Sequence, residues 1–190
     1  MDIEARGNSD DRRRSGLTPL LWATEFSTPR AVTTLLDAGA DPLTDSVKYN
    51  AVNYAVLRNK PDTLRALLDW DSDLAQSPDR LGSNALNTAM FTGDEEIVDI
   101  LIGAGTDLNA RETVAQSTPL FVASGTQKVD LCLRLVRAGA DASIRDIHGK
   151  TFLPGLYSAL DKSRTGEFLR KRDKLEKELR DRGFPVETGR

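Results

Sequence analysis

The feature that most constrains this chain is a short motif that returns at a nearly fixed interval. The stretch AGAD stands at residues 38–41 and again at 138–141, and the degenerate forms WDSD and AGTD stand between them at 70–73 and 104–107. The successive steps are 32, 34 and 34 residues. A fixed period of this length predicts stacked repeats, in which each unit buries its apolar side against its neighbours.

Two further series keep the same phase, so the period does not depend on one motif. A single alanine stands 15 residues before each motif, and an apolar pair stands three residues before it. The alanines are Ala23, Ala55, Ala89 and Ala123, and the pairs are Leu35-Leu36, Leu67-Leu68, Leu101-Ile102 and Leu135-Val136. We interpret Trp22 and Tyr54, which directly precede two of the alanines, as packing between repeats.

The local chemistry predicts a helix pair in each repeat. Thr18 before Pro19 is typical of a helix start, because the hydroxyl can accept from free backbone N–H groups and proline suits the first turn. A second helix is expected over 29–37, where apolar residues recur at helical spacing. Gly39 should end it, because glycine adopts the left-handed conformation at little cost.

These residues resemble a known family. The stretches GLTPLLWA (16–23), DRLGSNALNTA (79–89), STPLFVA (117–123) and DIHGKT (146–151) resemble the start of an ankyrin repeat, and the four spaced motifs resemble its end. The resemblance covers roughly residues 13–185. It implies an all-α solenoid of about five stacked helix-turn-helix units with projecting hairpins, at about 13–45, 46–78, 79–112, 113–145 and 146–185.

Some positions depart from the family pattern. The second unit has YNAVNYA (49–55) in place of the threonine-proline start, and Asp71 replaces its terminal glycine. The third unit has Asn84 and Ala85 where threonine and proline are expected. The family's usual histidine after proline-leucine is absent throughout. We therefore interpret the chain as a diverged natural array.

The two ends of the array differ in character. Residues 1–12 are expected to form a polar tail or a short cap, and residues 186–190 a C-terminal tail. Pro154 and Gly155 should kink, shorten or restart the helix in which they fall, because a helix-interior proline costs about 3 kcal/mol. A long charged helix over about 167–182, with Phe168, Leu175 and Leu179 buried, is predicted to cap the array. The alternative is a basic docking surface for an acidic partner or a membrane.

Few residues of this chain suit catalysis. It has one histidine, His148, and one cysteine, Cys132, so a zinc site of the usual kind cannot form, and no phosphate-binding GxxxxGK[ST] loop is present. The net charge of −3 disfavours general nucleic-acid binding. We expect no catalytic residues, no metal and no cofactor. The partners are expected to include neither nucleic acid nor membrane, and we expect a cytoplasmic protein that is monomeric alone.

The resemblance also implies where a partner would bind, because family members usually use the hairpin tips and the exposed ends of the first helices on the concave side. Carried onto this chain, that surface consists of Arg14, Leu17, Glu25, Phe26, Tyr49, Leu57, Arg58, Arg80, Ser83, Phe91, Thr92, Ser117, Thr126 and Lys150. The function predicted from the resemblance is a non-catalytic protein–protein interaction module. The alternative is an immunity protein or inhibitor that neutralises a partner toxin or enzyme. An enzyme is much less expected.

Overall fold

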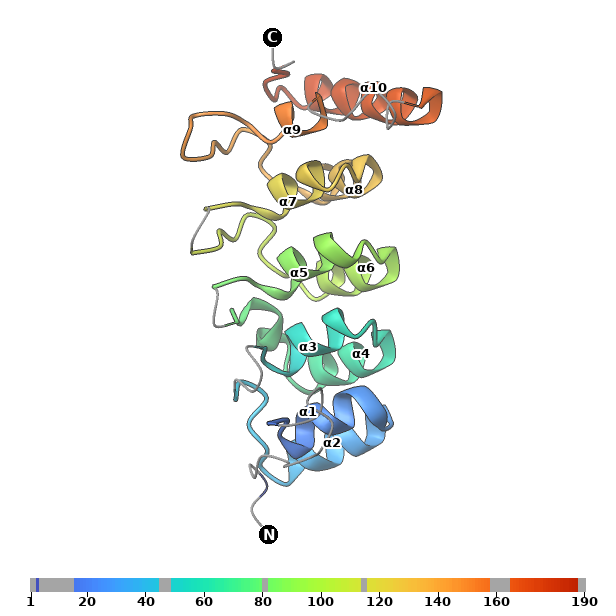
Figure 1. The fold of residues 1–190 in the computed structure, drawn as a ribbon, viewed down its shortest axis with the longest axis vertical. Coiled ribbons are helices and arrows are strands. Elements are labelled where there is room, and N and C mark those ends of the chain that lie inside the picture. The colour runs from blue at the N-terminus through green and yellow to red at the C-terminus, as the bar shows by residue number, and fades with distance from the viewer. Residues whose placement is uncertain are drawn as a thin grey trace. The chain divides into compact units, whose positions relative to one another are not determined.

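The computed structural model describes residues 3, 16–44, 49–79, 82–113, 116–157 and 165–187. Within these ranges every regular element is a helix and none is a strand, which confirms the all-α prediction (Figure 1). The chain divides into two compact units, residues 1–106 and 107–190. Among the residues described, no helix is both long and apolar enough to cross a lipid bilayer.

The first unit consists of helix pairs that stack on one another. The pairs are α1 (Pro19–Phe26) with α2 (Pro29–Asp37), α3 (Ala51–Leu57) with α4 (Pro61–Trp70), and α5 (Ala85–Thr92) with α6 (Glu95–Gly103). The first helices lie side by side in the order α1, α3, α5, and the second helices in the order α2, α4, α6. The connectors between pairs project on one side, as Figure 1 shows. The predicted helix over 29–37 is therefore confirmed with the same bounds.

Side chains at the helix starts supply the caps that the repeat needs. The Thr18 hydroxyl accepts a hydrogen bond from the backbone N–H of Leu21 at 3.3 Å, as its sequence context predicted. Asn50 and Asn84 do the same for α3 and α5, at 2.9 and 3.0 Å. The missing threonine-proline starts are thus replaced by asparagine, whose amide oxygen is also a good acceptor at this position.

The helix ends follow two different routes. After α2 the chain turns through Gly39, whose φ of +94° lies in the left-handed region, as expected. After α4, Asp71 adopts an extended backbone instead, and the chain continues into a short 3₁₀ helix, η1 (Ser72–Gln76). The Asp71 carboxylate accepts from the N–H of Asp73 at 2.9 Å and so starts this extra turn. In the second repeat, a side-chain cap by Asp71 thus takes the place of the glycine turn.

The in-phase series form the core. Ala55, Ala89 and Ala123 are fully buried, and so are Leu67, Leu101 and Leu135. Small alanines suit close approach between helices, and leucines supply larger apolar side chains to the core of each unit. Replacing any of these residues changes a packed interface, which explains why small and large positions keep their phase along the chain.

The second unit contains α7 (Pro119–Gly125), α8 (Val129–Ala138), α9 (Pro154–Tyr157) and α10 (Gly166–Asp181). The structure begins α9 at Pro154, which agrees with the expected restart of a helix at this proline. Gly155 lies close to α7, because a Cβ at this position would stand 2.6 Å from the Ser124 hydroxyl oxygen, which would have to shift. The α9 helix lies against α7, so a first helix is still present in this repeat, although a short one.

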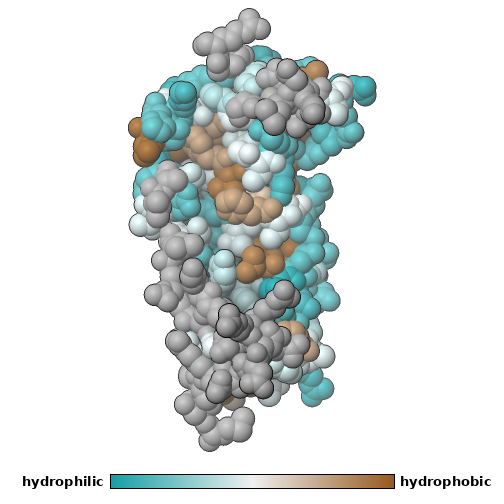
Figure 2. Space-filling view, in the orientation of Figure 1, coloured by the Kyte–Doolittle hydropathy of each residue, from teal (hydrophilic) through white to brown (hydrophobic). Residues whose placement is uncertain are grey.

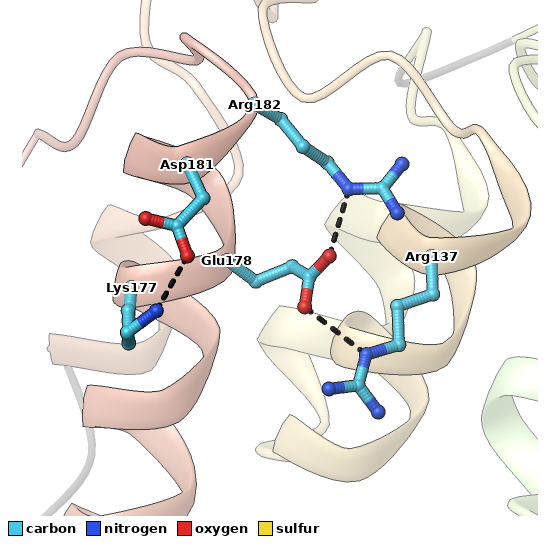
Figure 3. Close-up of polar contacts among 5 residues, drawn as sticks. All are labelled: Arg137, Lys177, Glu178, Asp181 and Arg182. Atoms are coloured by element: carbon cyan, nitrogen blue, oxygen red, sulfur yellow. Dashed lines mark hydrogen bonds and ion pairs between the residues drawn. The ribbon is translucent and has the colours of Figure 1, made fainter.

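The long charged helix α10 packs along α8. Leu175 and Leu179 are fully buried, as predicted, whereas Phe168 is half-buried. Ion pairs flank the apolar contact: Lys171 lies 2.7 Å from Asp130 at one end of α8, and Arg137 lies 3.1 Å from Glu178 at the other (Figure 3). Hydrogen bonds from Arg182 and Arg137 lower the pKa of Glu178. This docking supports the prediction of a capping helix.

After α10, the carboxylate of Glu187 binds the connector that precedes α9. Glu187 accepts hydrogen bonds from the backbone N–H of Thr151 at 3.2 Å and from its hydroxyl at 3.0 Å, and it pairs with Arg145 at 2.7 Å. The backbone hydrogen bond from Thr151, followed by the Arg145 contact, lowers the pKa of Glu187.

We expect the stability of the second unit to fall in acid partly through Glu187. Because its folded pKa is depressed, its contribution is present above the unfolded value of about 4.3 and is lost as the pH falls through the folded value. Urea unfolding measured between about pH 5 and about pH 3 should show a shallower pH dependence for Glu187→Gln than for the wild type. Equal slopes for the two proteins would contradict this assignment.

Candidate functional site

The predicted surface residues fall in both units, and each unit is described separately. Arg14 and Arg80 lie outside the residues that the structure describes. The first unit contains Leu17, Glu25, Phe26, Tyr49, Leu57, Arg58, Ser83, Phe91 and Thr92, and the second contains Ser117, Thr126 and Lys150.

A polar cluster of the first unit is centred on Glu25, near the end of α1. The Tyr54 hydroxyl on α3 donates a hydrogen bond to one carboxylate oxygen of Glu25, and Arg58, the residue after α3, donates to the other. Glu25 is 9% exposed, whereas the Arg58 side chain is 46% exposed. The carboxylate is therefore buried and paired, so the predicted surface position of Glu25 is wrong, while the Arg58 guanidinium that pairs with it still reaches solvent.

Tyr54 is the third member of this cluster. Its side chain is buried, and burial raises the pKa of Tyr54, so the hydroxyl stays protonated and remains a donor to Glu25 at neutral pH. The Arg58 guanidinium lies 6.0 Å from the centre of the Tyr54 ring. We call Glu25, Tyr54 and Arg58 the Glu25 cluster. It fixes the ends of two neighbouring first helices relative to each other.

Exposed apolar side chains stand beside the Glu25 cluster at the ends of three successive first helices. Phe26 on α1 is 41% exposed, Leu57 on α3 is 39% exposed and Phe91 on α5 is 66% exposed. Because α3 lies between α1 and α5, these residues stand at the ends of neighbouring helices, with Leu57 and Phe91 in the same repeat phase and Phe26 one position later. We call them the apolar strip. The face drawn in Figure 2 carries apolar patches between hydrophilic areas.

The other predicted residues of the first unit are placed differently. Leu17 is 2% exposed, so its side chain belongs to the core below the first connector and does not reach the surface. Tyr49 and Ser83 are half-buried in the connectors. Thr92 is exposed, although its hydroxyl donates to the backbone carbonyl of Ala89 at 3.1 Å.

In the second unit, the predicted residues contribute mainly to local turns. Ser117 is half-buried. The Thr126 hydroxyl donates to the carbonyl oxygen of Val122 at 2.9 Å and so closes the end of α7. Lys150 is exposed, and its backbone N–H donates to the Asp146 carboxylate at 2.9 Å.

The single cysteine and the single histidine do not stand in a catalytic arrangement. Cys132 is fully buried in α8, and burial raises the pKa of its thiol, so the reactive thiolate is disfavoured. His148 is exposed in a connector, where its backbone N–H donates to Asp146 at 2.8 Å. The described ranges contain no group of three or more histidine, cysteine, aspartate or glutamate residues placed to hold a metal ion.

A family model described as ankyrin repeats (three copies) matches residues 20–112 and, in a second register, residues 54–146. The chain belongs to the ankyrin repeat family. The overlapping matches agree with the repeat period, because the second begins one repeat after the first. Ankyrin repeat proteins generally act as protein–protein interaction modules, and the fold is typically non-enzymatic.

Relatives of this ankyrin repeat chain come from both bacteria and animals. It is 34% identical over 100 residues to Protein PhlB of Serratia liquefaciens, covering 53% of this chain and 44% of PhlB. It is 30% identical over 157 residues to human Ankyrin repeat and SOCS box protein 6, covering 80% of this chain and 28% of that protein. The chain thus spans less than half the length of these curated relatives.

A solved structure supports the same ankyrin repeat fold. The crystal structure of the ankyrin repeat domain of Bcl-3 matches with a TM-score of 0.76 and 23% sequence identity, covering 93% of this chain and 74% of that domain. At this identity the likeness concerns the fold alone.

Two features of the ankyrin repeat surface were not expected from the sequence. Trp22, predicted to pack between repeats, is 48% exposed, and its ring centre lies 5.4 Å from that of Phe26. Tyr54 is buried as predicted, but its hydroxyl also binds Glu25, 29 residues earlier. The spacing of Glu25 and Tyr54 was the sequence signal for this contact, because residues about one ankyrin period apart lie on neighbouring helix pairs.

Proposed function

We propose that this ankyrin repeat chain is a non-catalytic module that recognises another protein through the apolar strip and Arg58. The observation that supports the proposal is the exposure of Phe26, Leu57 and Phe91 at matching ends of three neighbouring helices. Exposed apolar side chains that gather in this way mark interaction surfaces more often than isolated ones do. Aromatic residues and arginine are also the commonest anchors of protein interfaces.

The Glu25 cluster makes this surface better suited to binding. Tyr54 and Glu25 hold Arg58 in one place, so less side-chain freedom is lost when a partner contacts the guanidinium. The half-exposed guanidinium can donate to a carboxylate or carbonyl of the partner at the edge of the apolar strip. We therefore expect a partner segment with apolar side chains and an acceptor group beside them.

We expect Phe26→Ala and Phe91→Ala each to weaken partner binding by about 10- to 30-fold, because anchor residues lose their buried apolar area when truncated. The partner would be captured from the native extract and identified by mass spectrometry. Its affinity for purified wild-type and variant chains would then be measured by isothermal titration calorimetry.

Trp70→Ala serves as the matched control. Trp70 is also an exposed aromatic, but it ends α4, on the second-helix side, where its indole N–H donates to Asp37 at 3.3 Å. It should leave the affinity within about twofold of the wild type. Unchanged affinity for both phenylalanine variants, with melting curves like the wild type, would remove the apolar strip as the site.

The immunity-type alternative predicts one additional result. If the captured partner is an enzyme or toxin, its activity should fall in a stoichiometric manner as the chain is added, and Phe91→Ala should shift that titration. A partner that is bound with full activity would favour an adaptor.

A further inference from the structure

A second apolar surface lies on the first helix pair and adjoins the apolar strip, because the Trp22 ring lies 5.4 Å from that of Phe26. It is a groove of about 700 Å³ between α1 and α2. Ala23 and Ala31 line it, as do the larger side chains of Trp22 and Leu35, and Arg30 is the charged residue of the lining. We call it the end groove. Arg30 lines the end groove, whereas Leu57 and Phe91 do not, so variants at Arg30 and at Phe91 test the two surfaces separately.

The later repeats show what covers the positions that line this groove. Moving by the 32- and 34-residue steps, Leu35 corresponds to Leu67 and Leu101, which are fully buried, whereas Leu35 is only half-buried. Trp22 is 48% exposed, but its counterpart Tyr54 is 5% exposed. In those repeats the preceding helix pair provides the cover, because α1 lies on α3 and α2 lies on α4. The end groove is thus a surface shaped to receive helices.

The described residues of the last helix present a charged outer side. The last helix, α10, buries Leu175 and Leu179 and leaves charged residues exposed, among them Arg170, Asp173 and Lys174. Terminal repeats ordinarily need a polar outer face for solubility. The exposed apolar lining of the first pair thus differs from the charged outer side of α10.

Charge indicates the kind of helix that fits. Arg30 corresponds in register to Glu96, near the start of α6. Glu96 pairs at 2.6 Å with Arg65, which stands on α4, the helix that covers α6. At the first repeat the sign is reversed, so the matching residue on a covering helix would be acidic. Within the described part of the chain, the Arg30 guanidinium has no ion pair.

We propose that the end groove binds an amphipathic α-helix of a partner protein, lying on α2 as α4 lies on α6, with an acidic residue opposite Arg30. A second copy of this chain suits the groove less well. Among the described residues of the lining, Arg30 is the one that carries a charge, so two grooves placed face to face would bring these cations together.

The chain itself supplies the probe. A stapled helical peptide copies residues 60–70 with Arg65→Glu and Trp70→Phe, and the control peptide keeps Arg65. The protein carries Trp70→Phe, which leaves Trp22 as its single tryptophan. The glutamate peptide is expected to shift the Trp22 emission to shorter wavelength, because the indole leaves water, and to bind at least about threefold more tightly than the arginine peptide.

Arg30→Glu should reverse the preference between the two peptides. This variant should fold, because Arg30 is exposed and an acidic residue is favourable in the first turn of a helix. Phe91→Ala should leave peptide binding unchanged, which separates this groove from the apolar strip. No emission shift with either peptide, or equal affinities that ignore Arg30→Glu, would overturn the proposal. Self-association seen by sedimentation and abolished by Leu35→Asp would also overturn it in favour of a second copy.

Discussion

Replacing Leu175 with alanine is expected to lower the free energy of unfolding by about 3 kcal/mol. Leu175 is fully buried where α10 lies on α8. The substitution removes apolar area from the interface and leaves a cavity, and both effects destabilise the packed state. Urea unfolding followed by circular dichroism measures the change, and hydrogen exchange should show faster exchange in α10 and α8 together.

Lys174→Ala is the matched control for this prediction. Lys174 is the preceding residue on the same helix but is exposed, so its replacement should change stability by no more than about 0.5 kcal/mol. The pair of variants also separates the two interpretations of α10. A capping helix depends on Leu175, whereas a basic docking surface depends on Lys174 and its neighbours. Wild-type stability for Leu175→Ala would remove the capping role.

The repeat architecture could be predicted because its determinants are local and periodic. Ala55, Ala89 and Ala123 stand at one phase in the sequence and are all fully buried. Thr18 and Gly39 begin and end helices through their own side-chain or backbone chemistry, so each could be assigned from a few neighbouring residues.

Where the sequence departs from the family pattern, the contacts that replace the usual ones could not be predicted in the same way. The sequence showed that Asp71 replaces a glycine, but not that its carboxylate caps a 3₁₀ helix in which Leu74 and Ala75 are buried. That outcome depends on burial by the rest of the unit. Asn50 is an intermediate case, because asparagine is a known helix cap, but the hydrogen bonds of its amide nitrogen to the carbonyls of Ser77 and Pro78 join distant segments.

The candidate site shows the same division. Leu57 and Phe91 share one repeat phase and are both exposed, but the residue of α1 in that phase is Glu25, which is buried, and the exposed Phe26 stands one position later. Leu17 was wrongly placed on the surface, because a connector position says little about which way a side chain points. The Glu25 cluster was missed because its members are 29 and 33 residues apart, and only stacked helix pairs bring them together.

Changing Arg58 to methionine is expected to lower the free energy of unfolding by about 2 kcal/mol and to weaken partner binding at the same time. Methionine keeps much of the length of the side chain but leaves the Glu25 carboxylate, which is 9% exposed, without its cation. A buried charge that loses its partner commonly costs about 3–5 kcal/mol, and the half-exposed position of Arg58 reduces this value. Thermal and urea unfolding give the stability term, and calorimetry with the captured partner gives the affinity.

Adding Glu25→Gln to the Arg58→Met chain tests the cause. The neutral amide oxygen can still accept from Tyr54, and no charge remains buried, so the double variant should recover at least half of the lost stability. Partner affinity should not recover, because the guanidinium at the edge of the apolar strip is still missing. Additive losses of stability in the double variant would show that Arg58 acts through packing, and recovered affinity would show that the partner does not contact Arg58. The two readouts thus separate the role of the Glu25 cluster in joining the first two repeats from its role in presenting Arg58 to a partner.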